Sequence, residues 1–311
     1  SEKEIVIPEG VTEIDAYVFQ YNNLTGVTFP DSLVSIGERA FFYCTSLTEL
    51  VLPDSLMKIG ESAFKYCDNL RSINIGSGLK QMEIFAFGEC NGLTDIQVSE
   101  ENENYKSEDG VLFSKDGKEL ILYPAAKEVQ EYAIGSDVTT VAYAAFANAS
   151  NLASVSVPKS VTSIGAWAFA KASLSEVTFA GDAPTFESDI DDSGYDWGKG
   201  TFAGVTATGY YPEGYKSWTE ELMQDIGSDM TWEEYELPGV AVSGTITSWE
   251  QDSDAEYLLY DSQWSYAEIR ADLALETPQL ALSAGTGGAV SSGSGGSYEQ
   301  TFTFDGVEAG T

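Results

Sequence analysis

Two consecutive stretches decide the fold: residues 30–52 (PDSLVSIGERAFFYCTSLTELVL) and residues 53–75 (PDSLMKIGESAFKYCDNLRSINI), which align position for position 23 residues apart. Further copies begin at Pro8, Gly76 and Pro158. A unit of 23 residues is too short to bury its own apolar face, so successive copies must stack. The repeat therefore predicts a solenoid in which equivalent residues of neighbouring coils lie side by side.

Apolar residues recur in register along these copies. A phenylalanine column comprises Phe19, Phe41, Phe64, Phe87, Phe146 and Phe169, and a leucine column keeps the same rhythm. Each copy ends in two apolar residues separated by one polar residue, which is typical of a strand with one buried face. Stacking such strands about 4.8 Å apart predicts a parallel sheet along one face of the solenoid. The Ala-Phe segment of each copy is too short for a stable α-helix and predicts a single 3₁₀-like turn.

The step between Phe87 and Phe146 is longer than the others and indicates an insertion, which we place at residues 99–133. Residues 111–113 and 120–123 are strand-like, and Asp116-Gly117 between them is typical of a hairpin turn. We expect a hairpin after which the repeat resumes.

The repeat resembles the BspA-like class of leucine-rich repeats. Val161-Thr-Ser-Ile-Gly165 with Ala168-Phe169 matches the family pattern closely, and so does Ile36-Gly37 with Ala40-Phe41 and Cys44. The resemblance covers roughly residues 5–180. It implies a mainly β leucine-rich-repeat solenoid over residues 1–180, a bacterial cell-surface or secreted protein, and binding or adhesion to a host or neighbouring-cell protein or glycan.

Two further segments follow the repeats. Residues 181–237, which contain Tyr210, Tyr211, Trp218 and Trp232, resemble the segment that closes such arrays, and a cap is needed because a bare terminal coil would expose apolar core. These aromatic residues predict a small core, with a sugar-stacking platform as the alternative. Residues 238–311 resemble an Ig-like or transthyretin-like antiparallel β-sandwich that lacks its closing strands.

Charge and composition narrow the function. The chain carries 50 acidic and 15 basic residues, a net charge of −35, and this field repels nucleic acids and anionic lipid surfaces. The absence of histidine excludes Ser-His-Asp and Cys-His nucleophiles and histidine-ligated metals. We expect no enzyme, no nucleic-acid partner and no membrane insertion, and a monomer unless the C-terminal edge strand pairs with another chain.

The outward residues of the predicted sheet are the candidate ligand site: Glu49, Arg71, Asn74, Asp95, Gln97, Ser156 and Glu176. Solenoids commonly bind along such a face. The alternative is a polar surface that only contacts solvent.

Cysteines and one acidic loop are candidate metal ligands. Cys44, Cys67 and Cys90 share one repeat position, which Asn22, Ala149 and Ala172 fill in other copies, and this favours buried free thiols over a disulfide or a zinc site. Asp189, Asp191 and Ser193 match the first half of a calcium loop, but Gly200 stands where a bidentate glutamate is required. We therefore expect no cofactor beyond weak Ca²⁺ binding.

Three functions remain open at this stage. The main hypothesis is a non-catalytic extracellular binding or adhesion module. The first alternative is a structural stalk that displays another domain. The second is a glycan hydrolase that uses two carboxylates, which would need a cleft with the two acids at a set separation.

Overall fold

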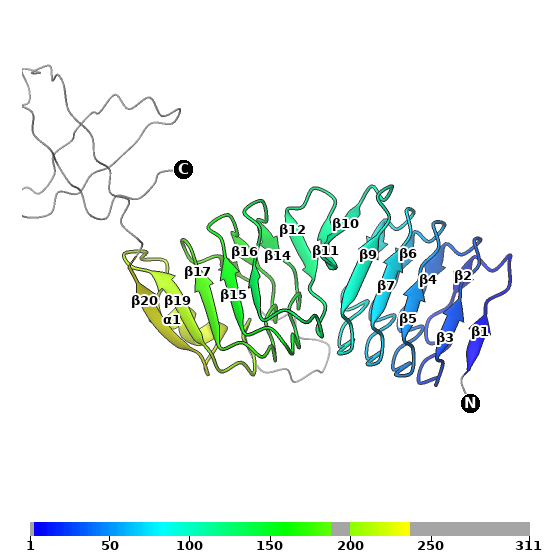
Figure 1. Ribbon diagram of the computed structural model, residues 1–311, viewed down its shortest axis with the longest axis horizontal. Helices are drawn as coiled ribbons and strands as arrows, with labels where there is room; N and C mark the ends of the chain where they lie inside the picture. The colour runs from blue at the N-terminus through cyan, green and yellow to red at the C-terminus, as the bar shows by residue number, and fades with distance from the viewer. Residues whose placement is uncertain (1–2, 188–199, 237–311) are drawn as a thin grey trace, which may run out of the picture. The chain divides into compact units, whose positions relative to one another are not determined.

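The computed structural model describes residues 3–187 and 200–236. These residues form a stack of coils in which the first coils lie at the right of Figure 1 and the last at the left. Each coil contributes one strand to each of two faces, and almost no helix is present in the described residues. The predicted β-solenoid with repeats of about 23 residues is confirmed for this part of the chain. The predicted C-terminal β-sandwich, residues 238–311, lies outside the described residues.

The longer strands lie on one face and pair in parallel. In the first half they are β1 (Glu4–Val6), β3 (Gly26–Thr28), β5 (Glu49–Val51), β7 (Ser72–Ile75) and β9 (Asp95–Val98). In the second half they are β13 (Glu131–Ala133), β15 (Ser154–Val157), β17 (Glu176–Phe179), β19 (Thr208–Pro212) and β20 (Thr231–Tyr235). These strands pair as three parallel sheets, β1-β3, β5-β7-β9 and β13-β15-β17-β19-β20. We call the surface that they form the sheet face.

Shorter strands form the second face. The first set is β2 (Glu13–Ile14), β4 (Ser35–Ile36), β6 (Lys58–Ile59) and β8 (Gln81–Met82). The second set is β10 (Tyr105–Glu108), β11 (Val111–Ser114), β12 (Glu119–Leu122), β14 (Thr140–Val141), β16 (Ser163–Ile164) and β18 (Thr185–Phe186). A short helix, α1 (Glu220–Ile226), lies near the C-terminal end of the stack, and the Thr219 hydroxyl caps it by accepting a hydrogen bond from the Leu222 amide.

The phenylalanine column occupies the core as predicted. Phe64 is fully buried between Phe41 and Phe87, with ring centroids 5.0 and 5.4 Å away and interplanar angles of 5° and 11°. Phe169 stacks in the same way between Phe146 and Phe202. Aromatic pairs of this kind contribute about 0.5–1.5 kcal/mol beyond the area they bury, so the column stabilises each half along its length.

The turn beside the phenylalanine column differs from the prediction. Ala40 N donates to Gly37 O and Cys44 N donates to Phe41 O, which are hydrogen bonds between residues three apart. However, Arg39 and Tyr43 have φ angles of 50° and 61°, in the left-handed region. A 3₁₀-helix needs negative φ throughout, so the predicted 3₁₀ turn is wrong for the described coils, which use successive overlapping tight turns instead.

The insertion divides the stack into two halves. Strands β10, β11 and β12 form an antiparallel meander, and β12 then pairs in parallel with β14. The coil therefore resumes at β12, earlier in the chain than our hairpin prediction placed it. Tyr123 enters the phenylalanine column there, with its ring 5.0 Å from Phe146. The buried residues accordingly form two main clusters, one that ends at Leu112 and one that begins at Val111.

The three cysteines are buried and free, as the repeat position predicted. Each thiol lies beside the main-chain carbonyl of a phenylalanine in the preceding coil, with Cys44 Sγ 3.1 Å from Phe19 O and Cys67 Sγ 3.4 Å from Phe41 O. The thiols thus act as weak hydrogen-bond donors inside the stack.

The cap is held by an aromatic cluster. Trp218 is 6% exposed, its Nε1 donates to the Gly181 carbonyl at 3.0 Å, and its ring lies 4.7 Å from Phe179 and 5.5 Å from Trp232. Burial and these contacts support a structural core at this end. Within the described residues, no helix has the length and apolar character required to cross a bilayer.

Candidate functional site: the interrupted sheet face

The predicted ligand residues of the first half lie in two registered rows. Glu49, Ser72 and Asp95 are partners across β5, β7 and β9, and so are Val51, Asn74 and Gln97. The Gln97 amide donates to Asp95 Oδ2 at 2.9 Å, which links the rows at the β9 edge. Arg71 precedes β7 and is exposed. These residues therefore share one small surface that is polar except for Val51, which is 57% exposed.

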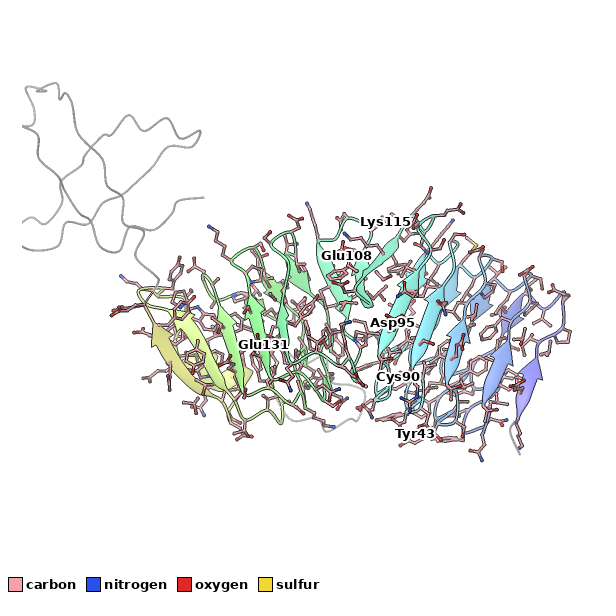
Figure 2. The ribbon with its side chains drawn as sticks, viewed as in Figure 1. Tyr43, Cys90, Asp95, Glu108, Lys115 and Glu131 are labelled. Atoms are coloured by element: carbon pink, nitrogen blue, oxygen red, sulfur yellow. The ribbon has the colours of Figure 1, made fainter. Side chains whose placement is uncertain are left out.

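The predicted residues of the second half lie on a separate sheet. Ser156 pairs with Thr178, and Glu176 lies between Ser154 and Thr208 in the neighbouring row. Strand β9 does not pair with β13, so the sheet of β5, β7 and β9 does not continue into the sheet that begins at β13. Figure 2 shows Asp95 on β9 and Glu131 on β13 at the two sides of this interruption. The predicted ligand residues therefore lie on two separate sheets, and their role in binding stays a prediction.

A turn from the insertion occupies the free edge of β9. Ile96 N donates to Gly110 O at 3.1 Å and Val98 N donates to Ser107 Oγ at 3.0 Å, which satisfies two amides that would otherwise lack a strand partner. Gly110 has φ of 75°, and a Cβ at this position would lie 2.4 Å from Asp95 Oδ1. Glycine is required here by both its backbone conformation and the close approach of Asp95.

A hollow of about 360 Å³ lies between the insertion and the segment after β13. Its lining includes five charged residues, which are Lys106, Glu108, Asp109, Asp116 and Asp137, together with the aromatic residues Phe113 and Tyr132. Lys106 Nζ contacts Glu108 Oε1 at 2.7 Å.

The pKa of Tyr132 shows how the hollow is charged. Burial raises this pKa well above its usual value, and the charges of Glu108 and Asp109 raise it further. The phenol therefore stays neutral and can serve as a hydrogen-bond donor or an apolar wall. Carboxylates beside an aromatic wall fit an ammonium or guanidinium group.

The hollow was not predicted from the sequence, because its two walls come from segments about twenty residues apart. The sequence does indicate turns in one of these two segments, because Asp109 and Asp116 are each followed by glycine. Within the described residues, no three Asp, Glu or Cys side chains gather closely enough to hold a metal ion. The predicted calcium ligands Asp189, Asp191 and Ser193 lie outside those residues.

Comparisons with known proteins agree with the coil pattern. The family model described as BspA type leucine rich repeat region matches residues 1–109 and 123–190 in six copies. The two matched ranges leave out residues 110–122, which contain all of β11 and β12. No curated protein matches the chain.

Solved structures with similar coils come from several bacteria. A leucine-rich repeat protein from Eubacterium ventriosum is 20% identical with a TM-score of 0.51, over 74% of this chain and 72% of the other. The pneumococcal vaccine antigen PcpA is 20% identical with a TM-score of 0.47, over 75% and 79% of the two chains. A leucine-rich cell surface protein from Faecalibacterium prausnitzii is 21% identical with a TM-score of 0.37, over 75% and 88%. At these identities the likeness concerns the fold alone.

Proposed function

Because the chain belongs to the BspA-type leucine-rich-repeat family, we propose that it is a non-catalytic binding or adhesion module outside a bacterial cell, which captures a protein ligand on the sheet face. The ligand covers the polar rows of β5, β7 and β9 and places a basic side chain in the neighbouring hollow. The protein works as a monomer, since one face of one chain supplies all of these contacts.

The observation that carries this proposal is the combination of the registered rows with the acidic hollow at their edge. The rows hold Glu49, Asn74 and Gln97 on rigid strands, so that little side-chain or backbone ordering is needed when a ligand binds. The hollow adds concave shape and negative charge next to a surface that is otherwise flat. A protein with an exposed lysine or arginine matches both features better than a neutral glycan does.

The experiment is a binding screen against purified extracellular proteins and an oligosaccharide panel, repeated at low and high salt. For a protein that binds, Asn74→Ala combined with Gln97→Ala should weaken the affinity by about tenfold, and Glu108→Gln should reduce the salt dependence. The matched control is Ser156→Ala with Thr178→Ala, which removes polar atoms from the equivalent rows of the second half.

The outcomes separate the alternatives. Equal losses from the two double variants would show that the ligand does not distinguish the sheets, and would overturn the site assigned here. Binding to oligosaccharides alone would overturn the protein-ligand proposal. A folded monomer that binds no member of either panel would favour the structural stalk.

A further inference from the structure

The interruption of the sheet face has one closed side and one open side. On the β9 side, the amides of Ile96 and Val98 donate to the turn of the insertion, so that edge is already occupied. In the part of the chain that the structure describes, β13 pairs only with β15, and no main-chain hydrogen bond joins β13 to β9 or to the meander. Figure 2 shows Glu131 on this open strand. The interruption therefore leaves a free strand edge in the middle of the stack.

The hydrogen bonds between β13 and β15 show which main-chain groups lie at this free edge. Ile134 N donates to Ser156 O at 3.0 Å, and Gln130 O accepts a hydrogen bond from a β15 amide at 2.9 Å. Successive residues of a strand turn their main-chain groups to opposite sides, so the N–H and C=O groups of Glu131 and Ala133 face the interruption. Both residues are exposed. We call these four groups the β13 edge, and a row of this kind is a template for pairing with another chain.

The hollow of about 360 Å³ lies beside the β13 edge. Tyr132 and Ala133 are part of its lining, together with Glu108 and Asp109 at the turn between β10 and β11. The Tyr132 side chain lies on the inner side of β13, where its ring is 5.0 Å from that of Tyr123. Side chains of a strand alternate between its two faces. A strand added at the β13 edge would therefore direct every second side chain inward, toward the hollow.

The charges of the lining determine which side chain fits. Four carboxylates and one lysine line the hollow, and Nζ of that lysine, Lys106, already contacts Glu108 Oε1 at 2.7 Å. Among the described residues, no salt bridge is formed by Asp109, Asp116 or Asp137. A lysine or arginine side chain supplies the missing positive charge and can also lie against the aromatic wall.

We propose that the β13 edge binds an extended segment of the protein ligand as an added parallel strand, with a lysine or arginine of that segment in the hollow. This inference rests on the proposed function, because it describes how the same ligand reaches the hollow. In the parallel register of the sheet face, the basic residue lies opposite Tyr132. Its N–H donates to Glu131 O, and its C=O accepts from Ala133 N. The main chain of the ligand supplies affinity, and the hollow selects the side chain.

A second copy of this chain fits the β13 edge less well. Pairing between two β13 edges would bring two hollows together, each lined by four carboxylates and one lysine, and the two would repel each other. A neutral oligosaccharide cannot form the ladder of main-chain hydrogen bonds that the edge offers. These are the alternative occupants that the experiment must distinguish.

The test uses the full chain and the fluorescent peptide Thr-Val-Thr-Lys-Thr-Val-Thr with blocked ends, with binding followed by anisotropy at low salt. Its β-branched residues favour an extended backbone. One control peptide replaces Lys by Glu, and another carries a methyl group on the main-chain nitrogen of Lys. We expect each to bind at least about tenfold more weakly, because the first is repelled by the hollow and the second has lost its donor to Glu131 O.

Ala133→Pro removes the outward N–H of the β13 edge without removing a hydrogen bond to β15, and should weaken peptide binding at least about tenfold. The matched control is Val6→Pro. Ile7 N donates to Thr28 O, so the Val6 N–H faces away from β3, and its loss should change the affinity less than about twofold. Ala133→Ser retains the N–H and should bind as the wild type does.

Hydrogen exchange in the wild type provides a readout that does not depend on how a variant folds. Bound peptide should slow exchange of the Ala133 amide at least about tenfold, and should change that of the Tyr132 amide little, because Tyr132 already pairs with β15. Equal slowing of both amides, or none at either, would contradict an added strand.

The remaining outcomes separate this inference from the proposed function. Absence of peptide binding to the wild type, equal affinity of the Glu peptide, or equal effects of the two proline variants would each overturn the added strand. A wild-type dimer that Ala133→Pro dissociates would assign the β13 edge to a second copy, and displacement of the peptide by a neutral oligosaccharide would assign it to a glycan. A protein ligand weakened by Asn74→Ala with Gln97→Ala but not by Ala133→Pro would overturn the added strand and leave the proposed function standing. Peptide binding that requires the Ala133 N–H, with no protein bound in the screen, would support the added strand and count against the proposed function.

Discussion

The coils before the interruption and those after it share an interior but differ in what surrounds it. Both halves stack aromatic rings about 5 Å apart, Phe41 on Phe64 in the first and Phe146 on Phe169 in the second. The first half adds buried thiols and a row of tyrosines, where the second half has alanines, Asn148 and Lys171. The stacked interior is therefore what the fold demands, and the outer positions are free to serve binding.

The largest effect should come from breaking the shared interior. Phe64→Ala and Phe169→Ala each remove a fully buried ring from the middle of a stack, and each should lower the free energy of unfolding by about 3–5 kcal/mol. Denaturant titrations followed by circular dichroism measure this loss. Asn74→Ala, on the polar surface of β7, is the control and should change stability by less than about 0.5 kcal/mol. A small loss at one phenylalanine only would show that the two halves are not packed alike.

A smaller effect should follow from disturbing the junction between the halves. Gly110→Ala places a Cβ against Asp95 in a left-handed backbone, and we expect about 2 kcal/mol of destabilisation. Gly10→Ala is the matched control, because Gly10 has φ of 93° but no atom within 4 Å of the added Cβ. Hydrogen exchange at the Ile96 amide reports the junction directly, since this amide donates to Gly110 O. Equal effects at both glycines would mean that only backbone strain matters.

The smallest effect concerns pH, and the buried thiols of the first half should contribute one part of it. Burial raises the pKa of the Cys44 thiol from 9.0 to about 11, and burial also raises that of Cys67. Between about pH 9 and pH 11 the unfolded chain releases these protons while the folded chain retains them, so the stability that the neutral thiols contribute is lost as pH rises. The free energy of unfolding should therefore fall across this range, and less steeply in Cys44→Ala. If the free energy of unfolding of Cys44→Ala fell with pH as steeply as that of the wild type, the Cys44 thiol would not be a source of this pH dependence.

The sequence predicted the interior well because the interior is periodic. Phe41, Phe64 and Phe87 recur at a fixed step, and each needs only its equivalent in the next coil as a partner. Tyr123 fills the same column but was not predicted to do so. The turn that leads to it is shorter than the turns of the other coils, and the insertion shifts its residue number out of the 23-residue register.

The candidate site was harder to predict because it depends on contacts that the repeat does not specify. The residues of β5, β7 and β9 were placed on one surface by alternation alone. The end of that surface at β9 follows from a hydrogen bond to Gly110, whose position is set by the meander rather than by any repeat. The left-handed backbone at Tyr43 was also missed, because no glycine stands at that position to reveal it.

The direction of the hydrogen bonds between coils has a mechanical consequence. In each half they run from strand to strand along the length of the stack, between coils that are joined only to their neighbours (Figure 1). A tensile load along that length pulls on the bonds of one terminal strand at a time, so coils should peel away in sequence rather than all together. Each released coil of 23 residues would add roughly 75 Å of extended chain. Such a stack lengthens in steps under low force and can refold from the coils that remain.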